Sequence, residues 1–145
     1  MPAHYATVST LVLSDASSIY EAFVDPKKIN KFWLRRSAGP LHVGEPVRWE
    51  FLVPGASAIT TASALHSPSL IVFTWSDGVS VRIDIEERTR TSAVVRVKAG
   101  PFSSTAKAVG ATEGFSIVLS DLKVWLESGK SPNLVRDKAK LIARS

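Results

Sequence analysis

The apolar residues of this chain recur at two spacings: every second residue through the middle, and every third or fourth residue towards the C-terminus. Between 41 and 98 the alternating runs are short, and turn residues such as Pro54-Gly55 and Asp77-Gly78 separate them. Such punctuation is typical of an antiparallel meander. The strands are predicted near 3–13, 47–53, 58–66, 70–75, 79–86 and 92–98, with a short stub at 41–43.

Two short helices are predicted between the first strand and the meander. Asp15 precedes a run with helical spacing at 16–24, and aspartate is a favourable N-cap residue. Asp25 followed by Pro26 repeats this signal, because proline suits the first position of a helix. The second helix is expected to run to about Trp33.

The C-terminal part of the sequence predicts one long amphipathic helix over 105–129. Its apolar stripe follows the i, i+3, i+4, i+7 spacing of a helix face and comprises Ala108, Ala111, Phe115, Val118, Leu119, Leu122 and Leu126. The first half of this stripe is small, with Gly110 and Gly114 beside it, whereas the second half is large. Two interpretations are open: the small residues leave room for a cavity, or they let the helix and the sheet approach closely.

The order of these elements predicts an α+β fold, in which a curved antiparallel sheet of six or seven strands wraps around the long C-terminal helix. That helix is the only element long enough to cover the apolar face of the sheet. Residues 1–129 are expected to form one domain, since a chain of 145 residues fits a single hydrophobic core. Residues 130–145 are expected to form a basic tail that contains a short helix.

The hairpin around 76–78 decides which face of the sheet carries the aromatic side chains. A two-residue loop would place Phe73 opposite Arg82. A three-residue loop, with Gly78 in the left-handed conformation, places Phe73 opposite Val81 instead. Only the second register puts every large apolar residue of the two strands on one face, so we predict that register.

The inner face of the sheet and its helical roof supply the candidate ligand-binding residues. Ligand pockets are mostly apolar with a few placed polar groups, and the charged residues of the predicted strands fall on the outer face. The same aromatic side chains would also make an ordinary filled core, which is the alternative. The candidates are Trp33, Trp49, Phe51, Phe73, Trp75, Ala111, Phe115, Val118 and Leu119.

The composition of the chain excludes several kinds of functional site. The chain has no cysteine, which excludes disulfides, thiolate nucleophiles and cysteine ligands to a metal. Its three histidines have neither metal-ligand spacing nor paired carboxylates nearby, so no metal and no cofactor are expected. No segment resembles a signal peptide or approaches the ~20 apolar residues of a membrane span. We therefore expect a cytoplasmic protein without stable membrane association.

The formal net charge of +5 is concentrated at the C-terminus. A nucleic-acid-binding body would carry a basic face interleaved with aromatic residues. Only 27–36 (KKINKFWLRR) approaches that pattern, so no nucleic-acid partner is expected. The tail holds Lys130, Arg136, Lys138, Lys140 and Arg144 against Asp137, a net charge of +4 that leaves +1 for the rest of the chain.

Four segments resemble the START-like (SRPBCC) superfamily, which has the helix-grip fold of the birch pollen allergen. They are IYEAFVDPKKINKFW at 19–33, Gly44 before a strand, LIVFTW at 70–75, and EGFSIVLSDLKVWLESG at 113–129. Within the superfamily the chain looks most like bacterial proteins similar to the C-terminal domain of the heat-shock protein 90 ATPase activator. Phe115 stands where these relatives usually carry tryptophan. These are packing motifs, and none of them is catalytic.

The resemblance implies a hydrophobic cavity between sheet and helix that binds lipids, polyketides or other apolar molecules. Our leading hypothesis is therefore non-catalytic binding of such a molecule. A co-chaperone-like interaction module is the alternative, and a cyclase or hydrolase is a further one, for which Tyr5 and His66 would be the titratable candidates. Other polar residues that could point inward are Thr7, Thr112 and Ser63.

A protein partner or a homodimer is the remaining hypothesis, and it concerns the outer side of the long helix. Ile117 and Val124 are seven residues apart and therefore share a face. The tail offers apolar residues with basic residues on its other side, so we expect it to dock onto Ile117 and Val124 of its own chain or onto a partner. Glu113 falls on the outer face by helical angle and is expected to be solvated.

Overall fold

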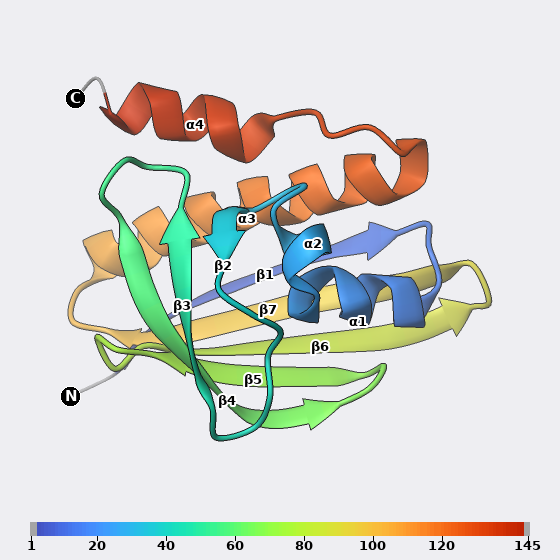
Figure 1. Cartoon of the computed structure of the whole chain (residues 1–145), viewed down its shortest axis with the longest axis horizontal. Helices are drawn as coiled ribbons and strands as arrows, with labels where there is room; N and C mark the ends of the chain where they lie inside the picture. Colours follow the sequence, from blue (N-terminus) through green and yellow to red (C-terminus); the bar gives the residue numbers. More distant parts are fainter. Residues whose placement is uncertain (1–2, 144–145) are drawn as a thin grey trace.

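A computed structural model describes residues 3–143, and within this range seven strands form one antiparallel sheet in the order β1-β7-β6-β5-β4-β3-β2. The sheet curls around the long helix α3, with the short helices directly after β1 (Figure 1). The predicted α+β architecture is therefore confirmed. The strands are β1 (His4–Val12), β2 (Leu34–Ser37), β3 (Pro46–Phe51), β4 (Ser57–His66), β5 (Leu70–Trp75), β6 (Ser80–Thr89) and β7 (Ser92–Phe102).

Four helices accompany the sheet in the described part of the chain: α1 (Ala16–Val24), α2 (Pro26–Ile29), α3 (Thr105–Ser128) and α4 (Leu134–Ala143). Asp15 caps α1 with a side chain that accepts from the N–H of Ser18, and Ser104 caps α3 in the same way. Gly129 ends α3 in the left-handed conformation that glycine adopts without strain. α4 then runs back alongside α3, on the side away from most of the sheet (Figure 1).

The hairpin between β5 and β6 has the predicted register. Phe73 pairs with Val81 and Ile71 pairs with Ile83, and Gly78 has a φ of 91°. All four of these paired side chains are buried on the inner face of the sheet. The requirement that large apolar residues share one face was thus enough to choose between the two loop lengths.

The segment 30–37 differs from the prediction. The second helix ends at Ile29, not near Trp33, and the chain then turns into β2, an edge strand that pairs with β3. Phe32, Trp33 and Leu34 are all buried. Three successive residues of an α-helix spread over about 200° of its surface, so one helix face could not bury all three. The predicted stub at 41–43 is reduced to an isolated bridge between Val43 and Ala62.

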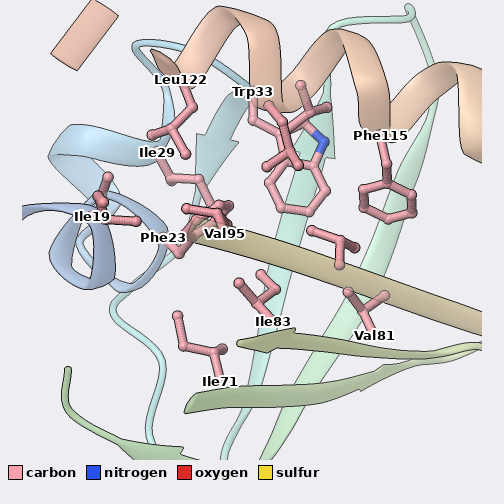
Figure 2. Close-up of a cluster of buried hydrophobic side chains, with 14 of the residues drawn as sticks. Ile19, Phe23, Ile29, Trp33, Ile71, Val81, Ile83, Val95, Phe115 and Leu122 are labelled. Atoms are coloured by element: carbon pink, nitrogen blue, oxygen red, sulfur yellow. The ribbon is translucent and has the colours of Figure 1, made fainter. Parts of the chain in front are cut away.

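One contiguous core lies between the sheet and the helices. Helices α1 and α2 fill the space under the C-terminal half of α3, where Ile19, Phe23 and Ile29 lie near Leu122 (Figure 2). The rings of Phe23 and Phe32 meet edge to face with centroids 5.4 Å apart. This end of the molecule is closed, which leaves the N-terminal half of α3 as the region where a ligand could enter.

Candidate functional site

A pocket of about 390 Å³ lies against α3 between Ala111 and Val118. It is also bounded by Trp33, the end of β3 with the β3–β4 connection, Trp75 of β5, the end of β7 and helix α4. Among its lining residues Lys138 alone carries a charge, and the rest are apolar or glycine. The lining comprises Trp33, Phe51, Leu52, Val53, Ala56, Trp75, Phe102, Ala111, Gly114, Phe115, Ile117, Val118, Val135, Lys138, Ala139 and Ile142.

Aromatic rings form the inner wall of the pocket. Trp75 stacks on Phe115 with an interplanar angle of 9° and centroids 6.2 Å apart. Trp33 meets Phe115 edge to face at 5.8 Å, and Phe51 meets Trp75 at 5.9 Å in the same manner. Each ring is therefore held by at least one other, which gives an apolar ligand a preformed surface.

The structure divides the nine candidate residues between two layers. Trp33, Phe51, Trp75, Ala111, Phe115 and Val118 line the pocket. Trp49, Phe73 and Leu119 do not line it and are buried in the core, and the rings of Trp49 and Phe73 are 5.0 Å apart. The sheet aromatics thus form in part the wall of the pocket and in part the filled core that the sequence left as the alternative.

Two of the four small residues in the first half of α3 lie at the pocket, whereas Ala108 and Gly110 do not line it. Ala111 and Gly114 both line it, and a Cβ added at Gly114 would meet no atom within 4 Å. Open space at this helix face is the arrangement expected if small residues leave room instead of drawing the sheet closer.

Comparison with known proteins gives no match to a protein-family model and no match to a curated protein. Solved structures do match. Protein SSP2350 from Staphylococcus saprophyticus shares 28% identity with a TM-score of 0.78, covering 88% of this chain and 94% of that chain. The Aha1 dimer from Colwellia psychrerythraea gives 17% identity and a TM-score of 0.79, with 88% and 98% covered. CalU16 from Micromonospora echinospora gives 16% identity and a TM-score of 0.72, with 98% and 88% covered.

The chain has the helix-grip fold of the START-like (SRPBCC) superfamily. The alignment with CalU16 leaves out about 2% of this chain, which is too little to omit the ten residues of α4. A C-terminal segment beyond the gripped helix is therefore compatible with the helix-grip fold. Within residues 3–143 no helix is long and apolar enough to cross a membrane.

Helix α4 supplies one wall of the pocket. Its lining residues Val135, Lys138, Ala139 and Ile142 follow the i, i+3, i+4, i+7 spacing of one helix face. They share the pocket with Ile117 of α3, whereas Val124 has 41% of its surface exposed. The predicted short helix therefore lies against Ile117 of its own chain, although Val124 stays largely in solvent. Arg144, counted in the basic tail, lies outside the described residues.

A buried carboxylate holds the beginning of α4. Oδ2 of Asp121 accepts the N–H of Val135 at 3.1 Å, and Asp121 is almost fully buried. Burial raises the pKa of Asp121, while hydrogen bonds from the N–H groups of Val135 and Leu134 oppose that shift. Asp121 thus occupies the role of an N-cap supplied from another helix. An aspartate beside the apolar stripe of α3 was the sequence signal for this contact.

An ion pair joins the two helices at the edge of the pocket. Lys138 Nζ of α4 contacts Glu113 Oε1 of α3. The Lys138 side chain is 34% exposed and that of Glu113 is 57% exposed. Glu113 lies on the exposed face as expected. The lysine that α4 brings against it is an addition that helical periodicity of α3 alone could not reveal.

The polar candidates for catalysis lie away from the pocket. Tyr5 is 45% exposed on the outer face of β1, with Lys98 Nζ 4.6 Å from the centre of its ring. His66, Ser63 and Thr7 are exposed as well. The expectation that Tyr5, Thr7 and Ser63 point inward is wrong, because the register of each strand turns these side chains outward. In the described part of the helix-grip domain no group of His, Asp or Glu residues could hold a metal ion.

Four buried side-chain polar atoms have no hydrogen-bond partner within residues 3–143, and one of them is Oδ1 of Asp121. The other three are Nε1 of Trp49, Nε1 of Trp75 and Oγ1 of Thr60, on the neighbouring strands β3, β5 and β4. An unpaired buried donor costs about 1–3 kcal/mol. Of these residues Trp75 alone lines the pocket.

Proposed function

We propose that this protein binds a small apolar molecule, of the size and character of a lipid chain or polyketide fragment, without transforming it. The observation that carries the proposal is the pocket of about 390 Å³ whose lining is apolar except for Lys138. Ligand sites in proteins are typically concave, mostly apolar and 300–1,000 Å³ in volume, and this pocket falls within that range.

The volume limits the ligand to a modest size. If each non-hydrogen atom takes about 30 Å³, as a water molecule does in the liquid, the pocket holds on the order of a dozen such atoms. Each Å² of apolar surface removed from water contributes about 25 cal/mol, and the cost of ordering the ligand offsets part of that gain. The stacked rings of Trp75 and Phe115 are already in place, which keeps the ordering cost on the protein side low.

A titration with a polarity-sensitive apolar dye, read by energy transfer from the tryptophans, tests this function. Ala111→Trp places a large ring in the pocket and is expected to abolish saturable uptake. Val109→Trp is the matched control, since Val109 lies on the same helix, is 60% exposed and does not line the pocket. The proposal fails if the folded wild-type protein shows no one-site uptake, or if Ala111→Trp binds the dye as the wild type does.

A protein-interaction module is the second candidate. It is favoured by apolar side chains left on the outer surface of the two C-terminal helices, namely Val124 at 41% exposure and Leu134 at 37%. The matching Aha1 structure from Colwellia psychrerythraea is a dimer. If this candidate is correct, Val124→Lys should change the oligomeric state or partner binding measured by light scattering while leaving dye uptake intact.

A further inference from the structure

The polar chemistry of the pocket is concentrated at one point. Lys138 is the single charged residue of the lining, and it lies on the α4 face between Val135 and Ile142. Its side chain is 34% exposed, so the stem lies along the apolar wall while the ammonium group reaches the edge of the pocket. A ligand that fills the pocket therefore meets apolar surface throughout and one positive charge at the rim.

We infer that the pocket selects amphiphiles that end in a carboxylate, with the apolar chain inside and the carboxylate bound by Lys138 in place of Glu113. This inference rests on the proposed function and adds the chemical class of the ligand. Glu113 shows what Lys138 binds, since it is itself a carboxylate held by that ammonium group.

Exchange of the two carboxylates is energetically easy. The Glu113 side chain is 57% exposed and returns to water when it is released, so its departure costs little. The incoming carboxylate makes an equivalent ion pair, and the attached chain adds the apolar burial that Glu113 cannot provide. A neutral ligand of the same length leaves the Lys138–Glu113 pair intact and gains only the apolar term. The carboxylate also releases the Glu113 side chain, which regains the rotamer freedom that the ion pair had cost it.

The opposite orientation is unfavourable for a carboxylate. On the aromatic inner wall, Trp75 stacks on Phe115 and its buried N–H has no partner, and the lining residues of that wall carry no charge. A carboxylate placed there would lose its hydration without meeting a counter-charge, a large penalty in an apolar environment. At the rim, Lys138 supplies the counter-charge and solvent remains close.

Decanoate, methyl decanoate and 1-decanol test the inference, because they share one apolar chain of a size that suits the pocket and differ in the head group. Affinities are measured by displacement of the dye at pH 7.5 and low salt. We expect decanoate to bind about three- to tenfold more tightly than the ester and the alcohol, because the two ion pairs are equivalent and the released Glu113 side chain regains its freedom. Lys138→Met keeps an unbranched apolar stem and is expected to remove that preference, so that decanoate and its ester bind equally.

Two further variants make the assignment specific. Glu113→Gln frees Lys138 from its competitor and is expected to raise the affinity for decanoate alone. Lys140→Met is the matched control, since Lys140 lies on the same helix, is exposed and does not line the pocket. It removes the same charge from α4 and is expected to leave the preference unchanged.

Each other outcome overturns the inference in a recognisable way. Equal binding of decanoate and its ester to the wild type would reject carboxylate selection and leave the proposed function standing. A preference for decanoate over its ester that survives Lys138→Met and disappears in Trp75→Phe would place the head group at the aromatic inner wall, beside Trp75. Failure of all three compounds and of the dye to bind would reject the proposed function together with the inference.

Discussion

The two halves of helix α3 face the same sheet and yet do different things. The C-terminal half carries Leu119 and Leu122, both fully buried, and Leu122 lies against the layer formed by α1 and α2 (Figure 2). The N-terminal half carries Ala111 and Gly114, has neither helix beneath it, and borders the pocket. One amphipathic helix can thus contribute both a close-packed core and a ligand site, and the size of its side chains decides which of the two forms.

The outer cover of the two halves differs as well. The core half is closed by α1 and α2, which lie between β1 and β2 in sequence, whereas the pocket half is closed by α4, which follows α3. Helix α4 is attached by Asp121, by the Lys138–Glu113 ion pair and by the apolar face around Ala139. The pocket wall is therefore held by few contacts compared with the core, and substitutions in the two halves should have different consequences.

The largest effect is expected in the core half. Leu122→Ala removes a fully buried side chain and should lower the free energy of unfolding by about 2–5 kcal/mol. Dye affinity of the protein that remains folded should be unchanged, since Leu122 does not line the pocket. Urea unfolding followed by tryptophan fluorescence gives the first quantity and dye titration the second. A loss below about 1 kcal/mol would mean that this half is not close-packed.

A charge placed under α4 should affect the pocket more than the fold. Ala139→Glu puts a carboxylate at a position that is 5% exposed, so α4 should leave the body and dye affinity should fall at least about tenfold. The free energy of unfolding should drop by about 1–3 kcal/mol. Lys140→Glu adds a carboxylate on the solvent side of the same helix and serves as the control. Unchanged dye affinity in Ala139→Glu would show that α4 is not a wall of the site.

Replacing Gly114, in the pocket half of α3, by alanine is expected to increase the stability of the protein. Gly114→Ala should stabilise the protein by about 0.5–1 kcal/mol, because alanine is the better helix former and its Cβ meets no neighbour within 4 Å. The added methyl group takes little of the pocket volume, so the dye Kd should change less than about twofold. Thermal unfolding provides the measurement, and a lowered Tm would contradict the open space described at this position.

The smallest effect concerns pH and the anchor of α4. Burial raises the pKa of Asp121 above its ordinary value of 3.8, so its contribution to stability is fully present below about pH 3.8 and is lost as the pH rises through the raised pKa. Asp121→Asn should abolish this loss. The free energy of unfolding of the variant should therefore rise relative to that of the wild type between pH 3.8 and 7. The lowered pKa values of Asp15, Glu86 and Glu127 act in the opposite direction in both proteins and cancel in the comparison.

Unfolding curves of the two proteins, collected across that pH range, provide the test. The difference in the free energy of unfolding between Asp121→Asn and wild type should increase with pH and level off above the raised pKa. A difference that stays constant or shrinks with pH would mean that Asp121 is not held in a carboxylate-unfavourable environment.

The sequence was most informative where one physical requirement decided between few alternatives. The facing of Phe73 and Val81 followed from the need to bury large apolar residues on one side of a hairpin. The cap at Asp15 marked a helix start because its side chain accepts the N–H of Ser18 in the first turn. These are short-range effects, and periodicity and local chemistry carry them.

Features that depend on contacts between segments far apart in the chain could not be predicted from the sequence. The strand at Leu34–Ser37 exists because β3 offers it an edge, which local propensity around 30–37 does not reveal. The role of Glu113 depends on α4 lying against α3, and the division between pocket residues and the deeper Trp49 and Phe73 depends on how far each ring reaches. An apolar pattern specifies the inner face, and packing in three dimensions decides which part of that face remains open.

The contrast between the two halves of α3 is tested most directly by methyl NMR spectra of the full chain during a titration with decanoate. The account predicts saturable shifts at the methyl groups of the pocket residues Ile117, Val135 and Ile142, with Ile19, Ile71 and Ile83 of the core unmoved. Shifts spread evenly over both sets, or no shifts at ligand concentrations that displace the dye, would contradict it.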